Sequence, residues 1–472
     1  MKLYQMIING EEVGHDLPRV DVHNPATGDV FASVPLGGTD EAIRAVDSAY
    51  NAFEKWSSLS TYERSDLIRN WYDLIKEHTD ELAKTMTEEQ GKPFLEAKGE
   101  INYANGFISW YAEEGKRIYG ETIPATQQNK RLFIHKQPVG VTAVITPWNF
   151  PAAMITRKVG PALAAGCTVV IKPASQTPLT AIKLVQLALE AGIPKGVINV
   201  VTGNSKLIGE AWLADTRVRK LTFTGSTEVG KELMKGAAET VKKVSLELGG
   251  HAPAIVMDDC DIDKAVDGVI AAKFRNAGQT CVCVNRVYVH ESIEKEFTKK
   301  LVEKVKLLKL GNGMTEGVTI GPLIDISAVR KALNHVNDAI EKGATLEIGG
   351  NRKEGLFFNP TVLTNVTDDM ICMKEETFGP VTPITVFKTE EEAIRRANDS
   401  IYGLAAYVFT ENISKGIRIS EKLEYGIVGL NDGSPSTPQA PFGGFKQSGL
   451  GREGGHHGID EYLEVKYISL GL

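Results

Sequence analysis

The chain has 472 residues, of which 42% are hydrophobic and 24% are charged, and its formal net charge is −7. That length predicts two or three domains, and the composition is typical of globular proteins. The acidic balance gives no reason to expect a nucleic acid or an anionic membrane as a partner. Because neither a signal-peptide core nor an apolar run of about 18 residues occurs, we expect a cytoplasmic protein without a membrane anchor.

The five cysteines follow no disulfide framework, which is typical of proteins from a reducing compartment. Cys281 and Cys283 are too close together for the usual zinc-binding pair, and the adjacent His456 and His457 have no partner at ligand spacing. We therefore expect no metal site.

The chain from Asp40 to about Glu89 has a helical pattern. Asp40 is predicted to cap the first of these helices. Apolar residues recur there at spacings of three and four, which predicts buried helix faces; in the first helix they are Ile43, Val46, Ala49, Phe53 and Trp56.

From about residue 139 the pattern changes to alternating strands and helices. Short apolar runs predict strands at 141–145, 168–171, 197–201, 221–223 and 243–248, with helices at 152–165, at 181–191 and from Glu228. Alternation at this pitch implies parallel strands with right-handed crossovers. We therefore predict a Rossmann-type, doubly wound sheet.

A second α/β block follows, with predicted strands at 252–256, 286–290 and 382–387 and helices at 294–306 and 328–342. Two stretches lie outside both blocks: an alternating ribbon within 118–136 and the C-terminal EYLEVKYISLGL. We expect these two stretches to pair with each other or with another subunit.

Polar residues follow the predicted strands of the first block, at the sheet edge where ligands bind in this architecture. The turn TPWNFP places Asn149 there, either as an oxyanion donor or simply within a proline-bounded turn. IKPAS places Lys172 and Ser175 where a dinucleotide ribose binds, and this cationic, hydroxylic ending suits NADP; an ordinary solvated lysine is the alternative.

Two later motifs contain glycines beside candidate functional groups. In FTGSTEVG, Gly225 and Gly230 flank a turn that opens a helix, whose N-terminal amides suit a phosphate. In LELGG, Glu247 is a carboxylate in an apolar strand, so it is either used in chemistry or paired in a buried salt bridge.

In this order, PWNFP, IKPAS, FTGSTEVG, LELGG and FRNAGQTC resemble the aldehyde dehydrogenase superfamily, and EETFGP and PFGGFKQSGLGREGG match its later motifs. The resemblance covers nearly the whole chain. It implies an α/β fold with an NAD(P)-binding domain at 1–117 and 137–248 and a catalytic domain at 249–435. A small oligomerisation ribbon and C-terminal tail would comprise 118–136 and 436–472, in a homodimer or homotetramer.

By the same resemblance, the nucleophile is Cys281, the oxyanion donor is Asn149 and the general base is Glu247. The thiolate would attack the aldehyde, and the base would activate the water that hydrolyses the resulting thioester. NADP, slightly favoured, or NAD would contact Thr146, Pro147, Trp148, Lys172, Ser175, Gly225, Ser226, Gly230, Glu376 and Phe378.

Arg157, Arg275 and the C-x-C pair match the succinate-semialdehyde dehydrogenases, in which two arginines and a loop serine bind the substrate carboxylate. The corresponding loop here offers Ser436 and Thr437, but Pro435 and Pro438 depart from the expected pattern. Glutarate semialdehyde, another ω-carboxy aldehyde or a broader range of aldehydes are the alternatives. The arginines would otherwise be structural, Arg157 on a helix surface and Arg275 in an ion pair.

Cys283 is either a packing residue or a redox partner of Cys281, since a disulfide across one residue is strained and easily reduced. A non-catalytic homologue is the alternative from a different class of protein. Such a homologue would be expected to lack Cys281, Glu247 or Asn149, and all three are present.

Overall fold

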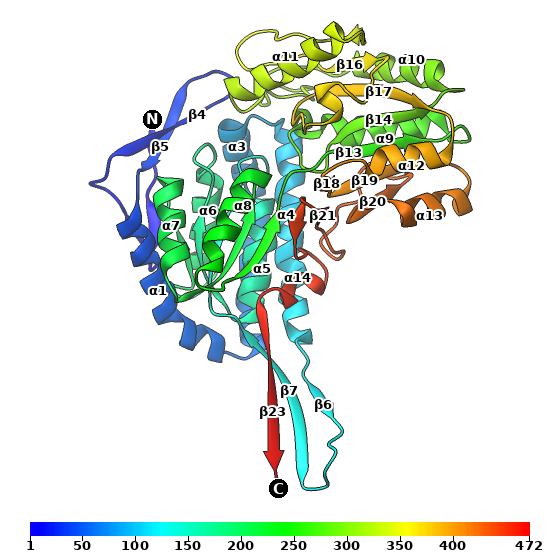
Figure 1. Cartoon of the computed structure of the whole chain (residues 1–472). Coiled ribbons are helices and arrows are strands. Elements are labelled where there is room, and N and C mark those ends of the chain that lie inside the picture. The colour runs from blue at the N-terminus through cyan, green and yellow to red at the C-terminus, as the bar shows by residue number, and fades with distance from the viewer.

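The computed structural model describes all 472 residues, and an eight-stranded sheet forms the centre of one of its two lobes (Figure 1). The five central strands of this sheet are parallel. The strand order is β22 (Gly449–Leu450), β12 (Lys243–Glu247), β11 (Val218–Thr224), β8 (Val141–Ile145), β9 (Thr168–Lys172), β10 (Ile198–Val200), β2 (Met6–Ile8) and β3 (Glu11–Val13).

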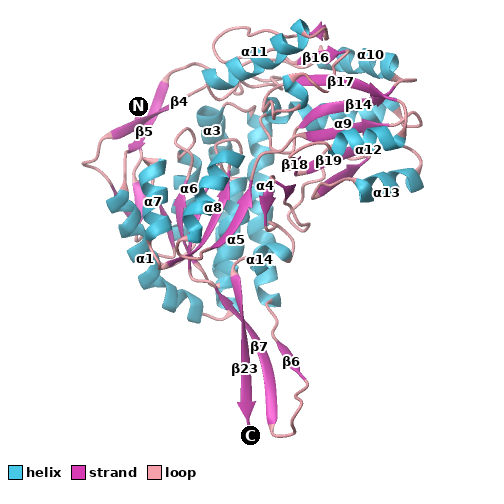
Figure 2. Ribbon diagram, viewed as in Figure 1, coloured by secondary structure: helices cyan, strands magenta, loops and turns pink.

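Helices cover both faces of this sheet (Figure 2). Val144 and Val169 face one hydrophobic core, whereas Val141 and Val170 face another, because successive side chains of a strand point to opposite faces. The helices of this lobe are α1 (Thr39–Ser58), α2 (Thr61–Glu77), α3 (Thr79–Gln90), α4 (Phe94–Glu114), α5 (Ala153–Ala165), α6 (Leu179–Glu190), α7 (Ser205–Ala214) and α8 (Thr227–Ala238). The predicted doubly wound sheet is confirmed.

The second lobe contains a seven-stranded sheet with its own hydrophobic core. The strand order is β15 (Thr345–Ile348), β16 (Thr361–Thr364), β17 (Val381–Phe387), β14 (Val284–His290), β13 (Ala252–Val256), β19 (Ala405–Phe409) and β20 (Ile427–Leu430). Its helices are α9 (Ile262–Phe274), α10 (Glu294–Val305), α11 (Ile326–Glu341), α12 (Glu390–Asn398) and α13 (Ile413–Lys422). None of the helices in the structure combines the length and the apolar character that a membrane span requires.

The two predicted ribbon segments pair with each other, in a three-stranded sheet that extends away from both lobes (Figure 1). β7 (Lys130–Pro138) lies antiparallel between β6 (Glu121–Ile123) and β23 (Leu463–Gly471). The tail between the loop that contains Ser436 and Thr437 (the late loop) and β23 returns to both lobes. It does so through β22 in the large sheet and through β21 (Phe445–Lys446), which pairs with β18 (Tyr402–Gly403). The short helix α14 (His457–Asp460) precedes β23. Near the N-terminus, β5 (Val30–Pro35) pairs with β1 (Lys2–Leu3) and β4 (Arg19–His23).

The start of α1 differs from the sequence prediction. Gly38, not Asp40, is the N-cap, and its backbone N–H donates to Glu41 Oε2 at 2.8 Å, so the carboxylate of the third helical residue satisfies this amide. Asp40 lies within the first turn of the helix. Ile43, expected in the core, is 40% exposed, and Ala42 and Ala45 occupy the buried face instead.

Candidate active site

The site lies where the strand order of the large sheet reverses. The chain passes from β8 to β9 and β10 on one side and to β11 and β12 on the other, so the loops after β8 and β11 diverge and leave a crevice. The strands end at nearly the same level, since Ile145 pairs with both Lys172 and Phe223, and Thr224 pairs with Glu247. The motifs that the sequence singled out therefore meet at one edge.

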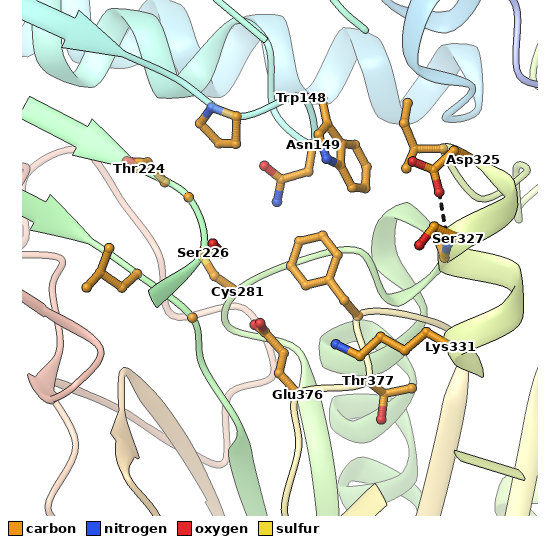
Figure 3. Close-up of a pocket in the computed structure, with 17 residues that line it drawn as sticks. Trp148, Asn149, Thr224, Ser226, Cys281, Asp325, Ser327, Lys331, Glu376 and Thr377 are labelled. Carbon is orange, nitrogen blue, oxygen red and sulfur yellow. Dashed lines mark hydrogen bonds between the residues drawn. The ribbon is translucent and has the colours of Figure 1, made fainter. Parts of the chain in front are cut away.

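A cavity of about 450 Å³ occupies this edge and extends to the second lobe. Figure 3 shows Trp148 and Asn149 on one side of the cavity and Glu376 with Lys331 on the opposite side. Of the residues predicted from the sequence, eight line it: Pro147, Trp148, Asn149, Gly225, Ser226, Cys281, Glu376 and Phe378. The structure thus brings the proposed nucleophile, oxyanion donor and most of the proposed cofactor contacts together.

Cys281 follows an unusual backbone segment. Asn276, Ala277 and Gly278 have φ values of 53°, 54° and 76°, in the left-handed region that non-glycine residues rarely adopt. The backbone at Gly250 packs closely against the backbone of the nucleophile. Glycine is required there because a Cβ would lie 2.0 Å from the carbonyl oxygen of Cys281. Burial raises the pKa of the Cys281 thiol to about 12, opposed by the positive charge of Arg157.

The carboxamide of Asn149 is anchored to the nucleophile loop. Its Nδ2 donates to the carbonyl oxygen of Gln279 at 3.0 Å, which leaves one of its two N–H groups for another acceptor. The backbone carbonyl oxygen of Asn149 accepts from Lys92 Nζ at 2.8 Å and from Asn276 Nδ2 at 2.9 Å. The side-chain N–H donor of Asn149 is therefore fixed in position, as an oxyanion site requires.

Glu247 is buried at the end of β12, and its Oε2 has no hydrogen-bond partner. No cation lies within ion-pair distance of it, so the salt-bridge alternative is wrong. Burial, and then the negative charge of Glu453, raise the pKa of Glu247 well above its usual range, while Arg157 and Lys158 oppose this shift. An unpaired carboxyl with a raised pKa is suited to accept a proton near neutral pH.

The groups expected around a dinucleotide divide into two sets. Glu376 accepts from the backbone N–H of Gly250 at 3.0 Å, and burial raises its pKa to about 7. Phe378, at a φ of 55°, packs edge-on against Trp148 with 5.6 Å between ring centroids. Ser226 caps α8 by accepting from Val229 N at 3.3 Å, so the positive end of this helix lies beside the cavity.

The other set does not line the cavity: Thr146, Lys172, Ser175 and Gly230. Ser175 lines an adjoining cavity of about 470 Å³, which shares Ile324 and Asp325 with the first. Lys172 Nζ donates to the carbonyl oxygen of Pro173 at 2.7 Å, and burial lowers its pKa to about 8. Packing explains why residue 230 is a glycine, since a Cβ there would lie 2.3 Å from the side chain of Leu248.

One wall of the cavity, at the N-terminus of α11, was not predicted from the sequence. Asp325, Ser327 and Lys331 line the cavity there, and the side chain of Lys331 points toward Glu376 (Figure 3). Asp325 caps α11 by accepting from Ala328 N at 2.9 Å. An aspartate before an apolar helical run is a recognisable N-cap signal, but nothing in the sequence places this helix end beside β8 and β11.

The two arginines of the expected carboxylate site differ in their environments. Arg157 is 1% exposed and its Nε lies 2.6 Å from Glu453 Oε2, so the helix-surface alternative is wrong. Glu453 also pairs with Lys158. Arg275 is half-buried, has no acidic group within ion-pair distance and lies 5.1 Å from the ring of Phe150. The ion-pair alternative for Arg275 is therefore also wrong.

The late loop does not reach the cavity beside Cys281. Ser436 and Thr437 are absent from the cavity lining, and Thr437 Oγ1 donates to Gln439 Oε1 at 2.5 Å. Pro438 packs against α4, where a Cβ at Gly106 would lie 3.0 Å from its ring. Pro438, one of the two prolines that depart from the expected pattern, thus packs this loop against α4.

All five cysteines are free, and Cys283 is fully buried. Its Sγ accepts from Lys273 Nζ at 3.4 Å, while Cys281 lines the cavity. A Cys281–Cys283 disulfide would require this contact to break, and the redox pairing stays a prediction. The structure contains no cluster of three or more histidine, cysteine or acidic side chains suited to a metal ion.

A thiol, a held carboxamide and an unpaired carboxyl beside a dinucleotide-type sheet edge define a class of enzymes that oxidise aldehydes through a covalent intermediate. The chain matches the aldehyde dehydrogenase family over residues 13–468 and belongs to that family. The resemblance inferred from the sequence motifs is confirmed.

Individual relatives are similar over nearly their whole length. The chain is 56% identical to the succinate-semialdehyde dehydrogenase [NADP(+)] GabD of Escherichia coli, over 99% of this chain and 98% of that protein. It is 55% identical to the glutarate-semialdehyde dehydrogenase of Pseudomonas putida, over 99% and 98%. A crystal structure of an E. coli NADP-dependent enzyme matches with a TM-score of 0.99 at 55% identity, over 100% of this chain and 98% of that one.

Proposed function

We propose that this chain oxidises succinate semialdehyde to succinate with NADP, or alternatively NAD, as the hydride acceptor. The observation that carries the substrate assignment is Arg275, a half-buried cation six residues before Cys281 that has no acidic group within ion-pair distance. A free guanidinium near the nucleophile is costly in a site for neutral aldehydes and suits a substrate carboxylate. Glutarate semialdehyde is the second candidate, favoured by the similarity to the P. putida relative.

The residues present fit a nicotinamide dinucleotide. The N-terminus of α8 offers backbone amides to a phosphate, and the Glu376 carboxyl, which lines the cavity, offers an acceptor to ribose hydroxyls. The end of β9 carries Lys172 and Ser175 and no carboxylate, which favours NADP. When bound, the dinucleotide supplies the acceptor for the hydride that leaves the substrate carbon.

The chain's own residues would supply the remaining chemistry. The Cys281 thiolate adds to the aldehyde carbon, and the free N–H of Asn149 stabilises the oxyanion that forms. Loss of hydride leaves a thioester on Cys281. Glu247 then removes a proton from the water that attacks this thioester, which releases the carboxylic acid and restores the thiol.

The assay that tests this function compares kcat/KM for succinate semialdehyde and for butyraldehyde, which has the same chain length without the carboxylate. Each is measured with NADP and with NAD. We expect a preference of at least about 30-fold for the acid aldehyde, because leaving one partner of a buried charged pair unpaired costs about 2–5 kcal/mol. Similar values for both aldehydes would refute the substrate assignment and leave the family mechanism intact.

The substitution Glu247→Gln should permit the first turnover and block the following ones. Thioester formation does not need this base, whereas hydrolysis does, so we expect a burst of reduced cofactor and a steady-state rate lower by about 10²-fold. Since burial holds the Glu247 pKa high, wild-type turnover should rise with pH as this carboxyl ionises, and the variant should lose that rise. Stopped-flow absorbance over a pH series measures both; absence of the burst would contradict the role.

We also propose that oxidation by peroxide joins Cys281 to Cys283 and inactivates the enzyme reversibly. In wild type, dithiothreitol should restore activity after mild peroxide treatment, because a strained disulfide is easily reduced. In Cys283→Ala the same treatment should not give an intramolecular disulfide in peptide mass spectra. Complete inactivation of that variant, still reversed by dithiothreitol, would argue against the disulfide.

We propose that the ribbon mediates homo-oligomer formation. The outer strand β23 exposes Val465, Tyr467 and Leu470 by 66%, 59% and 45%, and such an apolar edge strand invites pairing with a second copy. Light scattering on the purified protein distinguishes a dimer from a tetramer, and a monomer would refute the proposal.

A further inference from the structure

We propose that the buried ion pair between Lys92 and Glu100, together with Asn276, positions the amide of Asn149, so that these residues set the rate of thioester formation without touching the substrate. The inference rests on the oxyanion role proposed above for Asn149.

Lys92 holds the middle of the loop that follows β8, at Asn149. Its side chain is wholly buried and forms an ion pair with Glu100, which is 1% exposed. Lys92 Nζ donates to the backbone carbonyl oxygen of Asn149 at 2.8 Å and lies 4.0 Å from the ring centroid of Phe150. The ammonium group therefore contacts the proposed oxyanion donor and the residue after it.

Glu100 holds the end of the same loop. Its Oε1 accepts from the backbone N–H groups of Ala152 at 3.0 Å and Ala153 at 3.3 Å, where α5 begins, while its Oε2 pairs with Lys92. A carboxylate is favourable at a helix N-terminus. One ion pair thus contacts both ends of the segment from Asn149 to Ala153, and this segment carries the amide.

Asn276 connects this segment to the nucleophile loop. Its Nδ2 donates to the carbonyl oxygen of Asn149 at 2.9 Å and also to that of Gln279 at 3.2 Å, the oxygen that accepts from Asn149 Nδ2. Gln90 Nε2 in turn donates to Asn276 Oδ1 at 2.9 Å. Both polar atoms of the Asn276 side chain are therefore hydrogen-bonded, and this side chain links the backbone of Asn149 to the loop that carries the thiol.

The position of this ion pair argues for a role beyond stability. Hydrophobic residues often replace a buried ion pair at no loss of stability, so a buried pair is weak evidence of a stabilising role. Here both charged groups make hydrogen bonds to the backbone of the loop that carries Asn149. A displaced oxyanion donor loses its effect, since such donors act only within hydrogen-bond distance of the developing charge.

The test compares two matched double variants, Lys92→Met/Glu100→Gln and Lys220→Met/Glu461→Gln. Lys220 is the control: it is also wholly buried, lies 3.6 Å from Glu461 and has its Nζ 5.0 Å from the ring centroid of Tyr462, but it has no contact with the loop after β8. The measurements are the stopped-flow burst rate of reduced cofactor, the cofactor Kd and the Tm. The aldehyde is the one that wild type oxidises fastest, so failure of the succinate semialdehyde assignment does not affect this test.

We expect the burst rate of the Lys92 variant to fall by about 10- to 10²-fold, with the cofactor Kd unchanged and the Tm close to that of the control. The control should keep the wild-type burst. Combined with Asn149→Ala, the Lys92 and Glu100 changes should lower the burst by less than about twofold further, because residues that act through one group are not additive. Asn276→Ala, tested alone, should give the same pattern and replaces the double variant if that one does not fold.

Three results would each overturn the proposal. The first is a wild-type burst rate in Lys92→Met/Glu100→Gln. The second is that these two changes lower the burst rate by the same factor whether residue 149 is asparagine or alanine. The third is that Asn149→Ala itself leaves the burst rate unchanged. The last of these would refute the oxyanion role too, whereas the first two would leave it standing.

Discussion

Replacement of Cys281 by alanine is expected to abolish aldehyde oxidation, with a loss of at least about 10⁴-fold in turnover, as is typical when a catalytic nucleophile is removed. Cys281 lines the cavity between Asn149 and Glu376, and no second thiol does so. Without the thiolate, no covalent adduct forms and hydride transfer has no tetrahedral donor. The measurement is steady-state turnover with any aldehyde that the wild type oxidises.

Cys283→Ala is the matched control, because it removes a thiol two residues away. Its Sγ contacts Lys273 in the protein interior and not the cavity, so this variant should keep its turnover. Cofactor binding by fluorescence should persist in both variants, which would show that both sites are folded. Substantial turnover by Cys281→Ala would refute the covalent mechanism.

Arg275→Leu should remove the preference for an acid aldehyde. We expect kcat/KM for succinate semialdehyde to fall by about 10²- to 10³-fold, since loss of one partner of a buried charged pair costs about 2–5 kcal/mol. The value for butyraldehyde should stay within about threefold of wild type, because it offers no charge to the guanidinium. Equal losses for both aldehydes would mean that Arg275 has a structural role.

Arg157 should respond differently, because its nearest carboxylate belongs to the protein. Its guanidinium lies between the ring of Phe442, 3.9 Å from its centroid, and Glu453. Arg157→Leu would leave Glu453 paired with Lys158 alone, so it should lower the Tm as well as the activity toward both aldehydes. Both arginines were expected from the sequence to bind the substrate carboxylate. Because Glu453 neutralises Arg157, we propose that Arg275 supplies most of the substrate selectivity.

Much of the fold was predictable from the sequence because its signals are local. The runs at 141–145 and 168–171 are apolar except for one threonine each, as is typical of strands buried on both faces, and they form β8 and β9. The errors were also local in origin. Asp40 is a good capping residue by type, but Gly38 lies at the actual helix start, where Glu41 satisfies its amide.

Only the site residues that lie in recognisable sequence motifs could be predicted. Asn149, Glu247 and Cys281 stand in recognisable motifs, and the structure places Asn149 and Cys281 around one cavity with Glu247 at the end of the adjacent β12. Asp325 and Lys331 stand in no such motif, so their presence in the cavity wall could not be expected.

By itself, the sequence determined the family, the doubly wound sheet and the residues available for covalent chemistry. Only the tertiary structure decided how charged side chains are placed: Arg157 is neutralised by Glu453, Arg275 has no acidic group within ion-pair distance, and Lys92 reaches the backbone carbonyl oxygen of Asn149. The physical reason is that a side chain's chemistry is fixed by its type, whereas its charge balance and desolvation depend on neighbours that the fold brings together.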